Sequence, residues 1–201
     1  MKDRGSYKPL SYFQLMEVTL RELLVEKGVL TEEQIRRQVE DMRGRTPERG
    51  ARVVAKAWTD SSYKKRLLEN GTKACEELGL DVPALKLVVV ENTPEVHNVI
   101  VCTLCSCYPR MLLGIPPDWY KSRAYRSRMV REPREVLKEF GLSISPHVQV
   151  RVHDSTADMR YLVLPMRPAG TEGWSDENLA PLVTRDSMIG VAVAKSPGTS
   201  A

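Results

Sequence analysis

The sequence lacks the features that mark several large classes of protein. No apolar run approaches the ~18 residues that a membrane span requires, and the opening stretch, Met1 to Arg4, leads into no apolar core of a secretory signal. There is no internal repeat. Hydrophobic residues make up 42% of the 201 residues and charged residues 28%, which excludes a disordered or fibrous protein. We therefore expect a globular protein of the cytoplasm with no membrane partner, built as one domain or two small ones.

A large excess of charge of one sign is also missing. The 30 Lys and Arg residues outnumber the 26 Asp and Glu residues by only four, too few to indicate nucleic-acid binding. Basic residues do gather between Lys121 and Lys138, where seven stand against two acidic residues. No platform of interleaved aromatic residues accompanies them, so we expect a solvated or partner-facing surface and no nucleic-acid partner.

The hydrophobic periodicity predicts an α+β fold. We expect a helical N-terminal part with an extended arm at residues 1–80, followed at residues 81–201 by an α/β body whose strands surround a metal-binding loop. Capping residues and Gly or Pro stops predict helices at residues 11–27, after Thr31, at 46–58, after Asp60, at 72–78, after Pro117, at 132–140 and after Ser175. Strands are expected at residues 85–90, 96–102, 148–152, 160–166 and 187–193.

Cysteine is scarce, but its distribution is informative. Three of the four cysteines, Cys102, Cys105 and Cys107, fall within six residues. A disulfide framework would spread its bridges across the chain. Clustered thiols in a chain without a signal peptide indicate metal or redox chemistry in a reducing compartment.

The spacing C-x-x-C-x-C allows one loop to surround an ion. If the sulfur of Cys105, the backbone nitrogens of Ser106 and Cys107 and the sulfur of Cys107 bind together, they form a planar N2S2 set with nearly unstrained chelate rings. The sulfur of Cys102 can then occupy one axial position and leave the sixth open. Such strong donors favour a trivalent low-spin ion over zinc.

Two other metal centres compete with this interpretation. A tetrahedral zinc site needs a fourth ligand, which Cys75, His97, His147 or His153 can supply. An iron–sulfur cluster also needs a fourth thiolate, and its usual spacings differ. No second C-x-x-C is present. The spacing therefore favours a metal and leaves the ion open.

Around the cysteine motif the chain closely resembles the α subunit of nitrile hydratase. The similar segments cover most of the chain: residues 24–30, 45–58, 70–80, 90–108, 113–122 and 161–193. The resemblance implies a trivalent cobalt or iron ion with Cys102 as axial ligand and Cys105, Ser106 and Cys107 supplying the plane. It further implies that Cys105 and Cys107 are oxidised to sulfinic and sulfenic acid. Thr103 is similar to the cobalt version, so cobalt(III) is favoured over iron(III).

The activity implied by this resemblance is that of a lyase, which hydrates a nitrile to an amide. A trivalent ion acts as a Lewis acid on the nitrile nitrogen or lowers the pKa of bound water. Alternatively, an oxygen of the Cys107 sulfenate acts as nucleophile or base. The Ser106 hydroxyl is expected to add a supporting hydrogen bond. Alternatively, serine stands here only because its side chain is small enough for the loop.

Four further residues are candidates by position. The resemblance places Asp158 and Arg160 behind the metal loop, where they support the ligands or form an ordinary ion pair in a turn. Trp119 is expected to line the substrate pocket or to pack in the core. Arg110 stands where typical nitrile hydratases have Trp, and here the chain is more similar to the γ subunit of thiocyanate hydrolase. An arginine at this point favours a polar or anionic substrate.

The resemblance also implies partners. A β subunit, as one chain or split into two, is expected to complete the active site at the interface with two arginines, and the N-terminal arm suits that contact. An activator protein that delivers cobalt is a further expected partner. The alternatives are a thiocyanate hydrolase γ subunit, which converts thiocyanate to carbonyl sulfide and ammonia, a metallochaperone or maturation form of the α subunit, and a non-enzymatic module stabilised by zinc.

Overall fold

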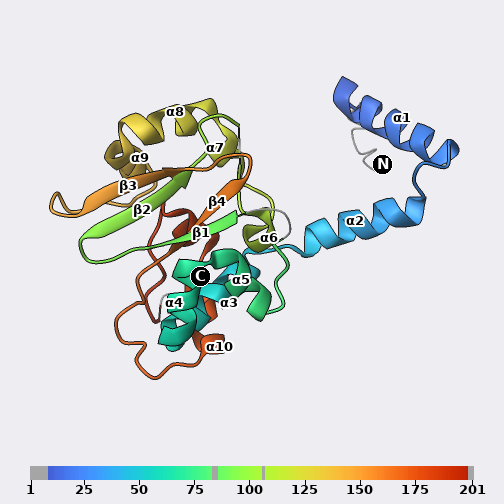
Figure 1. Cartoon of the computed structure of the whole chain (residues 1–201). Helices are drawn as coiled ribbons and strands as arrows, with labels where there is room; N and C mark the ends of the chain where they lie inside the picture. The colour runs from blue at the N-terminus through green and yellow to red at the C-terminus, as the bar shows by residue number, and fades with distance from the viewer. Residues whose placement is uncertain (1–8, 83–85, 106, 199–201) are drawn as a thin grey trace, which may run out of the picture. The chain divides into compact units, whose positions relative to one another are not determined.

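The chain forms two compact units that divide between residues 44 and 45. The computed structural model describes residues 9–82, 86–105 and 107–198 (Figure 1). The helices of residues 47–77 belong to the same unit as the strands. The first described strand begins at Lys86 and further helices follow it, so the boundary that we expected after residue 80 stays a prediction.

The N-terminal unit consists of two capped helices. α1 spans Tyr12–Glu26 and α2 spans Glu32–Gly44. Ser11 and Gln14 form a capping box before α1, and Thr31 and Gln34 make the same reciprocal pair before α2. No residue of either helix is buried. Apolar side chains lie exposed along both helices, among them Phe13 (79%), Leu20 (58%) and Val39 (40%).

The body is built on two pairs of parallel strands. β1 (Lys86–Glu91) pairs with β4 (Met159–Leu164), and β2 (Val96–Val101) pairs with β3 (Gln149–Asp154). These four strands confirm four of the five expected from sequence; residue 85, the expected start of the first, lies outside the described residues. In the second pair Val101 lies opposite Asp154, so the carboxyl ends of β2 and β3 meet at one edge.

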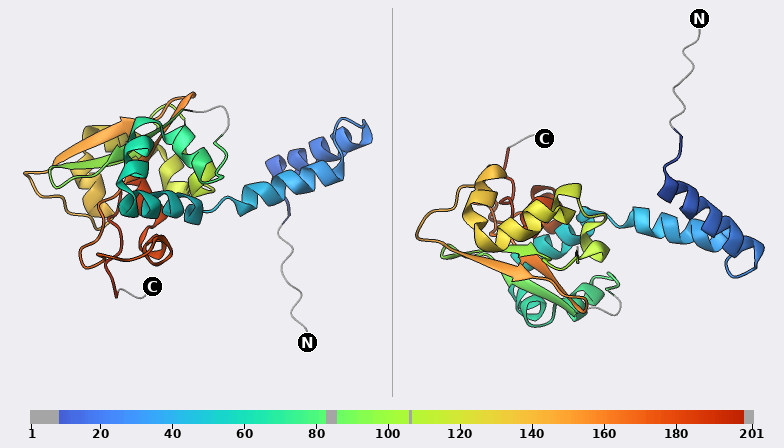
Figure 2. Two further views of the ribbon diagram at one scale, coloured as in Figure 1. Left: turned by 60° about the horizontal axis from the view of Figure 1, so that its bottom comes forward. Right: turned by 90° about the horizontal axis from the view of Figure 1, so that it is seen from above.

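Helices cover the strands on both sides. α4 and α5 contact β1, whereas α9 contacts β3 (Figures 1 and 2). α3 contributes six buried residues to the core, among them Val53, Val54 and Ala55, which are fully enclosed. The helices of the body are α3 (Pro47–Thr59), α4 (Ser61–Glu69), α5 (Gly71–Glu77), α6 (Arg110–Leu113), α7 (Asp118–Lys121), α8 (Arg123–Arg131), α9 (Pro133–Glu139), α10 (Asp176–Leu179) and α11 (Arg185–Ile189). None of the helices in the described part of the chain is long and apolar enough to cross a membrane.

The strand expected at residues 187–193 was wrong, because α11 occupies its first half. Thr184 begins this helix: its hydroxyl accepts from the backbone nitrogen of Ser187, and the Ser187 hydroxyl accepts from that of Thr184, at 3.1 and 3.0 Å. Gly190, with φ of +93°, then ends it. Residues 187–191 are buried, and so short a buried run has a periodicity that does not distinguish a helix from a strand.

A buried polar network connects β2 to the turn after α11. The side-chain oxygen of Asn92 accepts from the backbone nitrogen of Asn98 at 2.7 Å, which turns the Asn92 amide nitrogen toward Nδ1 of His97 at 3.3 Å. Nε2 of His97 therefore carries the proton and donates to the Gly190 carbonyl at 2.7 Å. Burial lowers the pKa of His97 and keeps the ring neutral. His97 thus has a structural role.

The close approach at Gly190 generates a stability prediction. A Cβ at this position would collide with the Asn98 carbonyl oxygen and lie 2.8 Å from the Cα of Val99. Gly190→Ala should therefore lower the free energy of unfolding by roughly 2–5 kcal/mol, through backbone strain and overpacking together. Urea denaturation of the full chain measures this change.

Gly173→Ala is the matched control, because Gly173 also has a positive φ (+76°) but has nothing within 4 Å of an added Cβ. It should cost only the backbone strain of about 1–2 kcal/mol. Equal losses in the two variants would contradict the packing account.

Candidate metal centre

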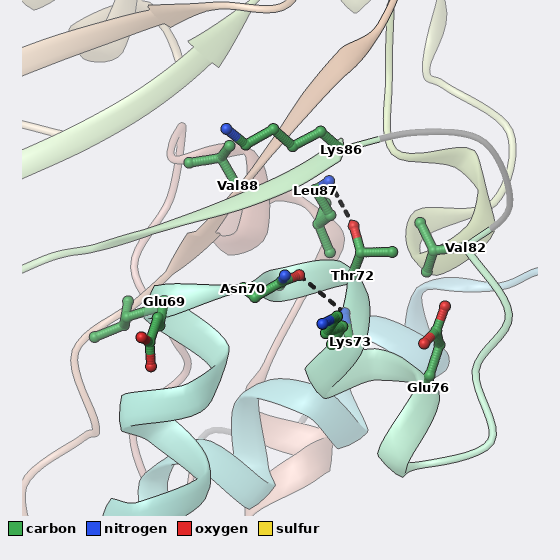
Figure 3. Close-up of a pocket in the computed structure, with 11 residues that line it drawn as sticks. Glu69, Asn70, Thr72, Lys73, Glu76, Val82, Lys86, Leu87 and Val88 are labelled. Carbon is green, nitrogen blue, oxygen red and sulfur yellow. Dashed lines mark hydrogen bonds between the residues drawn. The ribbon is translucent and has the colours of Figure 1, made fainter.

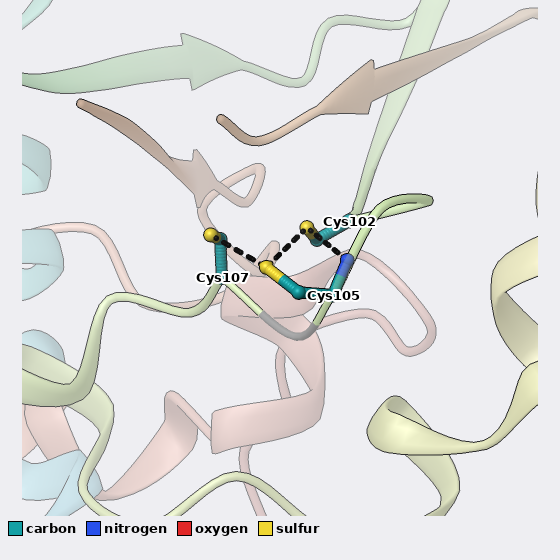
Figure 4. Close-up of side chains that lie close together, drawn as sticks. All are labelled: Cys102, Cys105 and Cys107. Carbon is teal, nitrogen blue, oxygen red and sulfur yellow. Dashed lines mark hydrogen bonds between the residues drawn. The ribbon is translucent and has the colours of Figure 1, made fainter. Parts of the chain in front are cut away.

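Three cysteines converge on the loop that follows β2. The Sγ atoms of Cys102 and Cys105 lie 3.5 Å apart and those of Cys105 and Cys107 lie 3.1 Å apart (Figure 4). All three sulfurs lie within 4.8 Å of one another. Cys102 is buried, Cys107 is half-buried and Cys105 is exposed. The cluster is thus enclosed at one end and accessible to solvent at the other.

The composition of the cluster bears on which metal fits. Ser106, the remaining member of the expected ligand set, lies outside the described residues. Among the residues that are described, the group contains the three cysteines and no His, Asp or Glu. Cys75 is buried in α5, and burial raises the pKa of its thiol to about 12. A closed tetrahedral zinc site needs a fourth side-chain ligand, so the cluster suits an ion that accepts three sulfurs and leaves positions for other donors.

Asp154, at the end of β3, holds the start of the loop. Its carboxylate accepts from the backbone nitrogen of Thr103 at 2.9 Å and from the Thr103 hydroxyl at 2.5 Å. The strand register positions it, because Asp154 lies opposite Val101, two residues before Thr103. Sequence reasoning missed Asp154. The signal was an acidic residue at the end of a strand that pairs with the strand before the cysteines.

Helices α7 and α8 hold the rest of the loop. Nη1 of Arg126 donates to the Cys105 carbonyl at 2.7 Å and to the Thr103 carbonyl at 3.5 Å. The hydroxyl of Tyr120 donates to the Cys107 carbonyl at 2.9 Å. We expected the basic stretch that contains Arg126 to be a solvated or partner-facing surface. That interpretation stays a prediction, but Arg126 is half-buried and binds the cysteine loop, a contact that the sequence did not reveal.

Opposing influences act on the pKa of the Cys107 thiol. Burial, followed by hydrogen bonds to the other two cysteines, raises the pKa of the Cys107 thiol to about 12, and the positive charge of Arg160 acts to lower it. Nη1 of Arg160 donates to the carbonyls of Thr156, Ala157 and Met159.

Asp158, the other residue expected behind the loop, is exposed, and its carbonyl accepts from the Lys86 nitrogen at 3.0 Å. Arg160, by contrast, acts on the cysteine loop through its positive charge, which lowers the pKa of Cys107. A supporting role for Asp158 and Arg160 stays a prediction.

The two expected pocket residues lie in different surroundings. Trp119 packs edge-on against Tyr125 and Phe140, with ring centroids 4.9 and 4.7 Å apart. These aromatic contacts account for its half-buried side chain. Arg110 is exposed at the start of α6, three residues after Cys107. Their roles toward a substrate stay predictions.

A surface hollow of about 800 Å³ lies elsewhere in the body, between α5 and β1 (Figure 3). The Asn70 side chain accepts from the Lys73 nitrogen and so begins α5. The Thr72 hydroxyl accepts from the Leu87 nitrogen and attaches this helix to β1. None of the residues that line this hollow belongs to the cysteine loop. The two features are therefore separate.

Comparison with known proteins identifies the family. The family model described as nitrile hydratase, alpha chain, matches residues 11–192. The chain belongs to the nitrile hydratase α-chain family. It is 55% identical over 180 residues to the cobalt-containing nitrile hydratase subunit alpha of Pseudonocardia thermophila, with 88% of each chain covered.

Two further relatives show how widely the family fold is used. The thiocyanate hydrolase subunit gamma of Thiobacillus thioparus is 45% identical, with 94% of this chain and 82% of that one covered. A solved double mutant of the Fe-type nitrile hydratase from Comamonas testosteroni Ni1 superimposes with a TM-score of 0.88 at 44% identity, covering 96% of each chain. Relatives named for cobalt, for iron and for thiocyanate thus share this fold, so the fold alone does not show which metal is bound or which substrate is used.

The cysteine geometry predicts which thiols bind metal. Cys105→Ala removes the sulfur that lies within 3.5 Å of both other sulfurs. It should abolish most metal binding, whereas Cys75→Ala should leave the metal content unchanged. Elemental analysis of each full-length variant, purified after growth with cobalt, measures the difference. Retention of the full metal content by Cys105→Ala would overturn the assignment, and loss in Cys75→Ala would restore a four-thiolate site.

Proposed function

We propose that the chain is the α subunit of a cobalt nitrile hydratase, which adds water to a nitrile to give the corresponding amide. The observation that carries this proposal is the convergence of the Cys102, Cys105 and Cys107 sulfurs within 4.8 Å. The 55% identity to a cobalt-containing nitrile hydratase subunit supports the choice of activity and metal.

Cys102, Cys105, Ser106 and Cys107 are the residues that would hold the ion. Because Cys102 is buried and Cys105 is exposed, an ion bound there would be shielded on the Cys102 side and accessible to substrate on the Cys105 side. Cobalt(III), when bound, supplies a Lewis acid that polarises a nitrile or activates water. In this proposal Cys105 and Cys107 carry the sulfinic and sulfenic oxidations, which place anionic, hydrogen-bond-accepting oxygens on the two sulfurs.

The chain's own groups position the reacting atoms. An oxygen on the sulfur of Cys107 acts as nucleophile toward the nitrile carbon or as base toward water, and the Ser106 hydroxyl supports it. The hydrogen bond from Tyr120 to the Cys107 carbonyl fixes this residue. When water attacks, the nitrile carbon gains its oxygen; when the Cys107 oxygen attacks, that oxygen enters the amide as its bond to sulfur breaks, and the oxygen of water replaces it on sulfur. In both cases the nitrogen gains the two protons of one water, so the amide forms without any net redox change.

A β partner completes the proposed enzyme, as one chain or as two. Oxidised cysteine oxygens are anionic and need cationic hydrogen-bond donors, and the partner's arginines are proposed to supply them. The exposed apolar side chains of α1 and α2 support a covered surface on the N-terminal unit, and the exposed Leu104 (87%) supports another on the cysteine loop. An activator protein for cobalt delivery and a cytoplasmic location belong to the same proposal.

The activity is tested on the full chain co-expressed with its β partner in cobalt medium. The complex should convert a nitrile to its amide, as followed by chromatography of the product. Without the partner's cationic donors the rate should fall by about 10²–10³-fold. The Cys107→Ala variant of the complex is the control for background hydration. Full turnover by the isolated chain would contradict the proposed need for a partner.

Thiocyanate hydrolysis is the second candidate function, because Arg110 is exposed close to the cysteine loop. A cation at this position favours an anion such as thiocyanate over a neutral nitrile. The 45% identity to a thiocyanate hydrolase subunit supports this candidate. The products separate the two activities, since thiocyanate gives carbonyl sulfide and ammonia whereas a nitrile gives an amide.

The variant Arg110→Gln tests the substrate charge. If thiocyanate is the substrate, loss of a charged hydrogen bond should raise its KM by about tenfold, while KM for a neutral nitrile changes by less than about twofold. Arg110→Lys keeps the charge and should retain most of the thiocyanate affinity. Equal effects on both substrates would show that Arg110 does not select by charge.

A further inference from the structure

We propose that Arg126 is a positioning residue of the metal centre, which fixes the cysteine loop and stabilises negative charge on the peptide that joins Cys105 to residue 106. This inference rests on the proposed function, because the nitrogen of that peptide is one of the proposed metal ligands.

The position of Arg126 is fixed by its own helix. Ser122 begins α8 by accepting from the Tyr125 nitrogen at 3.1 Å. The buried hydroxyl of Tyr125 donates to the Ile100 carbonyl at 2.7 Å and attaches the helix to the end of β2. Arg126 is the next residue. Its guanidinium is therefore held over the loop that continues from the same strand.

The contacts of Arg126 select one peptide of the loop. The shorter hydrogen bond, 2.7 Å, goes to the Cys105 carbonyl, and the longer one, 3.5 Å, goes to Thr103. The Nε of Arg126 is buried, and among the described residues no atom accepts a hydrogen bond from it. A buried donor without a partner is unfavourable. The charged guanidinium thus lies against the loop even though its Nε has no acceptor in the described part of the chain.

The chemistry of a peptide ligand gives this contact its role. When a peptide nitrogen binds a metal as an anion, the negative charge is shared with the carbonyl oxygen of the same peptide. The Cys105 carbonyl oxygen belongs to the peptide whose nitrogen is that of residue 106. A guanidinium donates a charge-assisted hydrogen bond, roughly twice as strong as a neutral one, so Arg126 stabilises the metal-bound form of this peptide. Tyr120 is neutral and donates to the Cys107 carbonyl, which belongs to the peptide between Cys107 and Tyr108.

Binding of Ni²⁺ to the reduced full-length chain tests the proposal, because Ni²⁺ favours planar nitrogen and sulfur donors. Competition with a chelator gives the affinity, and the visible absorption reports the planar donor set. Arg126→Gln should weaken binding by about 10–100-fold and diminish the planar absorption. Arg126→Lys keeps the charge and should recover at least part of both. Arg123→Gln, an exposed arginine on the same helix, should match the unmodified chain.

The possible results have distinct meanings. Unchanged affinity and absorption in Arg126→Gln would overturn the role of Arg126 alone. Equal losses in the Gln and Lys variants, with a matching fall in Tm, would reduce Arg126 to a structural contact and also overturn the proposal. Failure of the unmodified chain to bind Ni²⁺ at all would contradict the proposed ligand set and, with it, both the proposed function and this inference.

Discussion

Three cysteine sulfurs lie within 4.8 Å of one another on a short loop that is held at Thr103, Cys105 and Cys107. Thiolates repel one another, so a loop of this kind needs contacts from outside to keep them together. Asp154 holds Thr103, and Arg126 holds the Cys105 carbonyl. Tyr120 holds the carbonyl of Cys107. The parallel pairing of β2 with β3 and the attachment of α8 to β2 place these groups, which is how the fold serves the site.

Much of this arrangement could be predicted from local sequence. The cysteine spacing indicates a metal, and the caps at Ser11, Thr31 and Asp60 begin helices as expected, because capping depends on residues three positions apart. The first four strands were also predicted from β-branched runs. In each case the signal lies within a few residues of the feature that it specifies.

The missed features share a different cause. Asp154 and Arg126 reach the loop from β3 and α8, and nothing in the local pattern shows that these elements converge on it. Arg126 belongs to a basic stretch whose other members supported a surface interpretation. The helix at residues 185–189 was predicted as a strand because its buried residues, 187–189, form too short a run for the periodicity to distinguish a helix from a strand. Tertiary contacts decide each of these features, and a single sequence does not reveal them.

The central claim is that Cys102, Cys105, Ser106 and Cys107 form a cobalt centre that becomes active after cysteine oxidation. Intact-mass spectrometry with elemental analysis tests it most directly, on the full chain co-expressed with its β partner. The account predicts about one cobalt per chain and three added oxygens on the peptide that contains residues 102–107, as expected for one sulfinic and one sulfenic acid. Zinc in place of cobalt, with no added oxygen in the assembled complex, would contradict it.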